Sequence, residues 1–355
     1  MAVIHFTEKY LNRLVEGFKK SSETESLFSH DLDTEFSGTK TVHVRSLKTE
    51  PLQDYDRSKQ VGTGSRYGDT VEMSDYEQTF TMTQDRSLSL SVDRGNEEES
   101  SFLKKAGKVM AAEREERIVP EIDTYRLNKW AAEAGIHHEG AAPTNSTIVK
   151  AIIDLHNDMI DAGVPETGCT LLIKRQYLPA LKTSTEWLAL DSLGGKSLPK
   201  GAIGEIDGLA AKPVTSSKFP ANAAFMILYK GSVISPVRFK DFKGHTDPPG
   251  LSGDLIEFRM MYDAFVLGHK ADGVAVYCVT GSVQATPTIT ISGGNATIAS
   301  SGASKILYTL DGSDPRFSAD AQVYTAAVAA PAGTVVKAAA VASGKFMSAV
   351  AEKTA

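Results

Sequence analysis

The feature that most constrains this chain is a stretch of alternating polar and apolar residues followed directly by a long helix-forming run. The alternation extends from Val42 to Asp93 and predicts strands, with a polar, Gly-rich segment at residues 60–69 between them. This pattern predicts a long two-stranded hairpin, and such a ribbon is only marginally stable in water by itself. We therefore expect its stability to come from contact with a partner.

The helix-forming run covers residues 96–135 and would span roughly 55 Å at about 1.5 Å per residue. A rod of that length is too long to be wrapped by one compact domain. Pro120 lies inside it, lacks a backbone donor and clashes with the carbonyl four residues earlier, so we expect a kink or a short break there. The charged run Glu113–Arg117 is typical of a solvated helix face with mutually supporting charges.

The rest of the chain divides into two parts by composition. From residue 136 to about 280, helical and strand patterns alternate, with an apolar stripe from Ile148 to Met159 that ends at Gly163. This alternation predicts a mixed α+β region. After Val283 the chain is rich in Thr, Ala, Ser and Gly, and its short strand patterns are separated by tight turns, which indicates a small β-sandwich.

Composition argues against several classes of function. The 355 residues carry a net charge of -6, which disfavours general electrostatic attraction to DNA phosphates. The amino terminus lacks the basic region and apolar core of a signal peptide, and the longest apolar stretch, residues 223–229, is too short to cross a bilayer. We therefore expect no membrane partner and assembly in a cytoplasm.

No pattern in the sequence predicts a catalytic centre, a cofactor or a bound metal. The side chains of the run His137–Glu139 are adjacent in the chain, so they diverge and rarely converge on one ion. The acids at residues 311–320 are explained more simply by turn chemistry than by calcium. Cys169 and Cys278 lie in apolar runs and are expected to be buried free thiols.

Five segments, in their order along the chain, resemble the parts of a Hong Kong 97-like major capsid protein of tailed bacteriophages. They are Leu52–Arg57 with Thr83–Arg86 and Val92–Asp93, Arg117–Arg126, Leu171–Leu181, Ala202–Leu209 and Tyr262–Val266. The resemblance implies an α+β fold with an N-terminal arm at 1–44, an extended loop at 45–95, a spine helix at 96–135, an axial domain at 136–255 and returning peripheral-domain strands at 256–283. Residues 284–355 resemble the immunoglobulin-like module at the end of some chitobiase and hexosaminidase enzymes, which implies an all-β surface domain.

The resemblance implies a function in assembly. The chain would be a major capsid protein, not an enzyme, whose pentamers and hexamers form an icosahedral shell around double-stranded DNA without reading its sequence. The other implied partners are a separate scaffolding protein, a portal protein and a decoration protein, with assembly in the host cytoplasm and a final location in the virion capsid. The residues expected to contact neighbouring subunits are Tyr55, Arg57, Arg66, Tyr67, Arg86, Glu113, Arg114 and Arg117.

The resemblance carries two further expectations. Residues 251–283 contain no Asn that could be cross-linked to Lys48 or Lys59, so we expect a lattice held by non-covalent contacts. Deleting the residues after Val283 should leave assembly intact, because a surface domain is an addition to the shell. The alternative function is a glycan-binding or adhesion protein that acts through the β-sandwich and uses the first 280 residues as a support.

Overall fold

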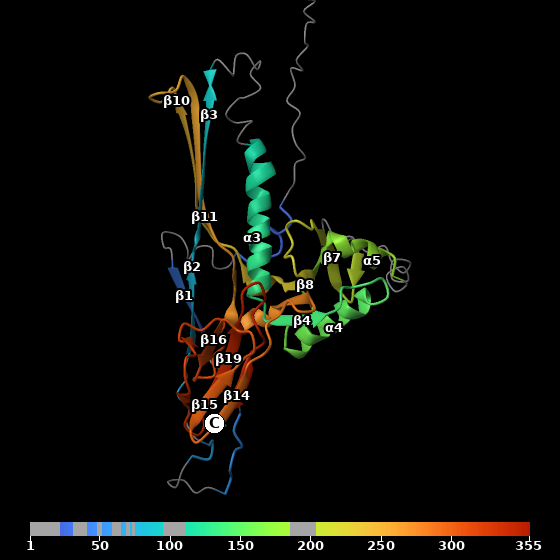
Figure 1. The fold of residues 1–355 in the computed structure, drawn as a ribbon, viewed down its shortest axis with the longest axis vertical. Coiled ribbons are helices and arrows are strands. Elements are labelled where there is room, and N and C mark those ends of the chain that lie inside the picture. Colours follow the sequence, from blue (N-terminus) through green and yellow to red (C-terminus); the bar gives the residue numbers. More distant parts are fainter. Residues whose placement is uncertain are drawn as a thin grey trace, which may run out of the picture. The chain divides into compact units, whose positions relative to one another are not determined.

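The computed structural model describes residues 22–30, 41–47, 52–58, 65–68, 72, 75–94, 111–184 and 204–355 (Figure 1). The chain forms two compact units, one of Met1–Lys40 with Met82–Thr280 and the other of Thr41–Thr81 with Gly281–Ala355. Helices and mixed sheets occur together in the first unit, so the expected α+β class is confirmed.

The core of the first unit is a six-stranded mixed sheet. Its strands lie in the order β4 (Ile136–Gly140), β13 (Val274–Val279), β8 (Ala223–Tyr229), β5 (Cys169–Lys174), β7 (Leu209–Val214) and β6 (Gly204–Ile206). β8 is buried along almost its whole length. This burial explains its uninterrupted apolar sequence, because a strand covered on both faces has no polar side.

The apolar stripe predicted between Ile148 and Met159 lies on α4 (Ile148–Asp161), which packs against this sheet. The fully buried residues of the stripe are Ile148, Ile152, Leu155 and Met159. Gly163 ends the helix with a φ of +87°, a conformation that glycine adopts without steric cost. Its N–H donates to the Ile160 carbonyl, and the N–H of Val164 donates to the Met159 carbonyl, so the last carbonyls of α4 are satisfied.

A second sheet of the first unit corrects the predicted hairpin. β3 (Gln84–Asp93), which we assigned to the second arm of the extended loop, pairs antiparallel with β11 (Gly253–Tyr262) along its whole length. β11 also pairs with β10 (Val237–Thr246), which gives the order β10-β11-β3. The alternating pattern of β3 indicates that one face is covered, but it carries no information about which strand lies beside it.

The predicted helix is continuous over the described residues 111–132 and passes Pro120 without a break. Residues Arg114–Ile118 form a π-helical turn, and α3 (Val119–Ala132) follows with Pro120 in its first turn. The N–H of Val119 donates to the Arg114 carbonyl, five residues earlier. The wider turn lets the helix continue past Pro120, although proline has no backbone N–H to donate. Residues 96–110 lie outside the described residues, so the start of the spine helix stays a prediction.

β13 corrects a second expectation. We assigned residues 256–283 to strands that return to the peripheral domain, yet β13 lies inside the six-stranded sheet, parallel to β4 and antiparallel to β8. Its residues Val274–Cys278 are all buried, as expected of a strand that is covered on both faces of a sheet.

The first unit also contains several short elements. β9 (Val233–Ile234) pairs with β12 (Phe265–Val266), and α5 (Leu178–Lys182) is a short helix. The 3-10 turns are η2 (Arg175–Tyr177), η3 (Lys230–Ser232) and η4 (Gly268–Gly273).

The second unit contains a two-stranded ribbon and the carboxy-terminal domain. β1 (Thr41–Leu47) pairs antiparallel with β2 (Asp75–Thr81), so the hairpin exists, but its second strand is β2 and not β3. The carboxy-terminal domain has one sheet of β14 (Thr288–Ser292), β15 (Asn295–Ala299) and β18 (Val328–Ala329), and another of β17 (Gln322–Val323), β16 (Lys305–Thr309), β19 (Val335–Val341) and β20 (Ala351–Thr354). Both sheets contribute to one apolar core that includes Ile289, Ile298, Tyr308 and Val336.

Candidate inter-subunit surfaces

A groove lies in the first unit between the beginning of the described helix and the sheet of β3 and β11. Its apolar and aromatic lining comes from Leu88, Ile118, Ile122, Phe258, Met260 and Tyr262. Its charged lining comes from Arg86, Glu113, Arg117 and Glu121. The groove therefore offers both apolar surface and charges of both signs to another molecule.

The sheet extends the apolar part of this groove. Leu88 on β3 lies opposite Phe258 on β11, which in turn lies opposite Phe242 on β10. Neighbouring side chains at such positions share one face of a sheet. Phe242 is 54% exposed, so the row ends in an uncovered aromatic side chain.

One ion pair crosses the groove. Arg86 Nε lies 2.7 Å from Glu121 Oε1, and both side chains are about half exposed. Ion pairs at that exposure contribute at most about 1 kcal/mol. Arg86 is thus held only weakly by its own subunit.

The described part of the extended loop presents aromatic side chains. Residues 52–58 run beside 65–68, because the N–H of Asp56 donates to the Arg66 carbonyl at 2.9 Å. Tyr55 and Tyr67 meet edge to face with ring centroids 4.9 Å apart. Tyr67 is 79% exposed and Leu52 is fully exposed. A large apolar area therefore faces solvent in the isolated chain.

Seven of the eight residues predicted from the sequence lie on these two surfaces. Arg86, Glu113 and Arg117 line the groove together, and Arg114 is exposed on the same π-helical turn without lining it. The other four, Tyr55, Arg57, Arg66 and Tyr67, lie in the loop segments 52–58 and 65–68. Their roles in subunit contacts stay predictions.

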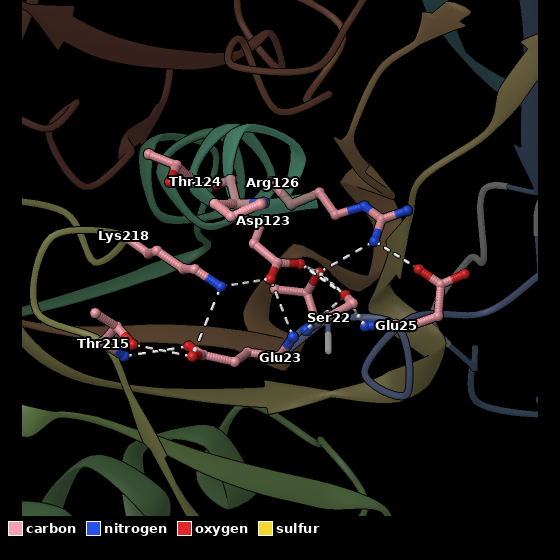
Figure 2. Close-up of polar contacts among 10 residues, drawn as sticks. Ser22, Glu23, Glu25, Asp123, Thr124, Arg126, Thr215 and Lys218 are labelled. Carbon is pink, nitrogen blue, oxygen red and sulfur yellow. Dashed lines mark hydrogen bonds and ion pairs between the residues drawn. The ribbon is translucent and has the colours of Figure 1, made fainter. Parts of the chain in front are cut away.

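A buried polar network, which the sequence patterns did not predict, holds residues 22–30 to α3. Asp123 is fully buried on α3 and accepts hydrogen bonds from Ser22 Oγ (2.7 Å), Thr24 Oγ1 (2.6 Å) and the Glu23 N–H (3.0 Å). Lys218 Nζ donates to the same carboxylate at 2.8 Å (Figure 2). Each polar atom of this carboxylate is therefore satisfied inside the protein.

Burial and hydrogen bonding act on Asp123 in opposite directions. Burial raises the pKa of the Asp123 carboxyl, but hydrogen bonds from Lys218, Thr24, the Glu23 N–H and Ser22 outweigh it, and the net pKa lies below its usual range. Asp123 is thus held in its charged form. The charged form is what pairs with Lys218.

Two further side chains extend the network. The carboxylate of Glu23 accepts from Thr215 N and Oγ1 at 3.1 and 3.0 Å. The guanidinium of Arg126, which is almost fully buried, donates to Thr24 Oγ1 and to Glu25 Oε2 at 3.1 and 2.8 Å. A sequence signal exists for this face of α3, because Asp123, Arg126, Leu127 and Trp130 recur at helical spacing, and all of them are buried.

A second buried carboxylate, that of Asp263 between β11 and β12, links Thr83 just before β3 to α3. Asp263 accepts from Thr83 N at 2.7 Å, from Thr83 Oγ1 at 2.9 Å and from Tyr125 OH at 2.7 Å. Burial, followed by the bond to Asp263, raises the pKa of Tyr125 to about 12. The tyrosine therefore stays neutral and donates a hydrogen bond to the carboxylate.

The two cysteines and the candidate metal ligands can now be placed in the structure. Cys169 and Cys278 are buried free thiols, as predicted, and burial raises their pKa to about 11 and about 12. Within the described ranges, no three His, Cys, Asp or Glu side chains gather so that they could hold a metal ion. His138 instead lies 3.0 Å from Asp158. Of the helices that the structure describes, none combines the length and apolarity needed to cross a membrane.

Solved structures of phage capsids share this architecture. The capsid of the Cyanophage P-SCSP1u gives a TM-score of 0.61 at 13% identity, over 78% of this chain and 94% of that chain. The asymmetric unit of the bacteriophage PhiM1 mature capsid gives 0.60 at 13% identity, over 78% of this chain and 93% of the other. This chain has a phage capsid fold. A structure from Mycobacterium phage Che8 gives 0.59 at 17% identity, over 77% and 96% of the two chains.

The sequence comparisons give a family match for most of the carboxy-terminal domain. The family model described as Fn3 associated matches residues 296–355, which extend from β15 to the end of the chain. Comparison with curated protein sequences finds no match. The similarity to capsid structures, which covers 78% of the chain, is therefore one of fold, while the similarity of the last 60 residues is one of sequence.

Proposed function

We propose that this chain is the major capsid protein of a tailed phage and that its copies assemble into an icosahedral shell around double-stranded DNA. The observation that carries the proposal is the extent of the fold match, because the chain accounts for 93–96% of the length of three structures from phages, two of them described as capsids. The proposal therefore rests on similarity of fold, and the exposed surfaces described above add to it.

The exposed loop residues support self-association. We propose that the tip formed by residues 52–58 and 65–68 of one copy docks into the groove of a second copy. Leu52 and Tyr67 would cover Phe258 and its apolar neighbours, and each large apolar side chain buried in this way contributes about 1.5–3 kcal/mol. Arg57 and Arg66 of the tip would meet carboxylates of the groove such as Glu113.

The negative net charge of the chain is consistent with a shell that encloses DNA without binding it tightly. A subunit with a net charge of -6 encloses DNA without binding it tightly or reading its sequence. In this proposal the chain forms pentamers and hexamers in the host cytoplasm, with a separate scaffolding protein, a portal protein and a decoration protein as partners, and its final location is the virion capsid. The similarity of residues 284–355 to the chitobiase and hexosaminidase module remains a proposal about their fold.

A pair of serine variants tests the docking. Leu52→Ser removes a fully exposed side chain of the tip, and Val323→Ser removes a side chain of similar character, 48% exposed, in the carboxy-terminal domain. We expect Leu52→Ser to weaken each contact by about 1.5–3 kcal/mol, roughly tenfold to a hundredfold, and to reduce shell yield without lowering the melting temperature. The control variant should assemble like the parent chain.

Sedimentation velocity and negative-stain microscopy of the two variants, each expressed with the native scaffolding protein, provide the measurement. Equal shell yields for both would remove the docking surface from the proposal. The alternative of a glycan-binding or adhesion protein predicts monomers that are retained on a sugar column, and the same preparations test it.

A further inference from the structure

The β1–β2 ribbon has one exposed face and one covered face. On the exposed face, His43 Nδ1 lies 2.7 Å from Glu77 Oε1, and Arg45 Nε lies 3.6 Å from the same carboxylate. On the opposite face Phe80 is only 2% exposed. The half-buried residues of that face are Val42, Val44, Tyr76 and Gln78. A two-stranded ribbon cannot cover such a face by itself, so its order depends on what packs against it.

The loop after β16 in the carboxy-terminal domain is fixed by its own acids. Asp311 Oδ1 accepts from the N–H and the hydroxyl of Ser313 at 3.0 and 2.6 Å. Asp314 accepts from the N–H of Arg316 at 2.9 Å and from its guanidinium at 2.7 Å. The side chain of Arg316 is only 9% exposed. Asp311 and Asp314, considered above as calcium ligands, thus hold this loop in its turns; we call residues 311–321 the bracket.

The bracket meets the ribbon. The N–H of Ala319 donates to the carbonyl of Glu77 on β2 at 3.2 Å. The ribbon and the residues Gly281–Ala355 belong to one compact unit, whereas Met82–Thr280 belong to the other. We infer that the carboxy-terminal domain is an internal clamp, whose bracket holds the β1–β2 ribbon and so orders the base of the extended loop in the same chain.

The clamp gives the carboxy-terminal domain a role in assembly. The ribbon leads at Leu47 and Asp75 into the segments that carry the exposed loop side chains, so its order limits the conformations of the tip. A tip that is ordered before it binds loses less conformational entropy on docking. This consequence rests on the proposed capsid function, and it replaces the expectation that deleting the residues after Val283 leaves assembly intact.

Two substitutions at one position test the clamp in the full chain. Ala319→Pro removes the N–H that bonds to Glu77, whereas Ala319→Ser keeps it, and the side chain of Ala319 is exposed. Hydrogen exchange is measured on unassembled subunits, over the ribbon strands and over β14 and β15 as an internal reference. We expect the proline variant to speed exchange in β1 and β2 about tenfold, the effect of one lost hydrogen bond, with the serine variant unchanged.

A second variant separates the loss of the contact from misfolding of the carboxy-terminal domain. Asp314→Ala keeps the Ala319 N–H but removes the acceptor that fixes Arg316, so it should also speed exchange in the ribbon while β14 and β15 stay protected. Unchanged ribbon exchange in both Ala319→Pro and Asp314→Ala would overturn the clamp. Faster ribbon exchange together with normal shell yield would overturn its role in assembly. A parent chain that forms no shells would contradict the proposed function, while the exchange data on unassembled subunits would still decide the clamp.

Discussion

Replacing Asp123 with Asn measures the strength of the buried network that holds residues 22–30. The substitution keeps the shape of the side chain but removes the negative charge that lies 2.8 Å from Lys218 Nζ. The two side chains are 1% and 4% exposed. Removing one partner of a buried pair costs about 3–5 kcal/mol, because the other charge stays buried. Glu23 Oε1 lies 3.6 Å from the same ammonium and offsets part of this cost, so we expect about 3 kcal/mol.

Urea unfolding followed by far-UV circular dichroism measures this loss in the first unit. The matched control is Asp158→Asn, which breaks the pair with His138 at 3.0 Å between side chains that are 46% and 40% exposed. We expect that control to cost less than about 1 kcal/mol. If Asp123→Asn costs no more than Asp158→Asn, the network contributes little and the reasoning fails.

Acid titration gives the same prediction an independent check. The pKa of Asp123 lies below its usual range in the folded chain, so its contribution is fully present above the unfolded value of about 3.9 and is lost as the pH falls through the folded value. The parent chain should therefore lose more stability than Asp123→Asn when the pH falls below about 3.9. Parallel losses in the two proteins would show that this carboxylate is not the group that titrates.

Three further predictions concern other parts of the chain. Tyr125→Phe removes the hydroxyl that donates to Asp263 at 2.7 Å and should cost about 1.5–3 kcal/mol in urea unfolding. Because the pKa of Tyr125 is raised to about 12, the parent chain should also lose stability more steeply than the variant as the pH rises from about 10 to 12, and equal slopes would contradict this assignment. Cys169 and Cys278 should not react with a thiol reagent until the protein is unfolded, and rapid labelling of the native chain would show that they are accessible. Mature shells should give a single monomer band on a denaturing gel, and a ladder of covalent oligomers would refute a non-covalent lattice.

Local patterns in the sequence predicted the helices and strands that are determined by residues close together in the chain. The stripe from Ile148 to Met159 became α4 because its spacing alone places one apolar face against a sheet. Gly163 ended that helix, as its freedom to adopt positive φ indicates. The strands after Val283 followed for the same reason, because alternation and turns are read within a few residues.

Pairings between distant residues could not be read in this way. The alternation in β3 shows that one face is covered, but the ten residues of β11 that pair with it lie more than 150 positions away in the sequence. Asp123 and Lys218 are separated by 95 residues, and each looks like an ordinary surface charge in its local sequence. The helical spacing of Asp123, Arg126, Leu127 and Trp130 marks one face of α3, but it does not show that Lys218 lies beside that face.

The candidate surfaces lie between these two cases. The resemblance to capsid proteins selected Arg86, Glu113 and Arg117, and the structure brings these three residues to one groove although β3 was assigned to a different element. The resemblance did not predict that Phe242 is exposed, because its exposure depends on β10 lying at the edge of a three-stranded sheet.

The proposal that identical copies complete one another is tested most directly by electron microscopy of the full chain expressed with its native scaffolding protein and purified without fixation. Closed particles with pentamers and hexamers of this chain, in which the loop tip of one copy lies on the groove of the next, are the predicted result. A uniform population of monomers under those conditions, with the loop tip still exposed to solvent, would contradict the proposal.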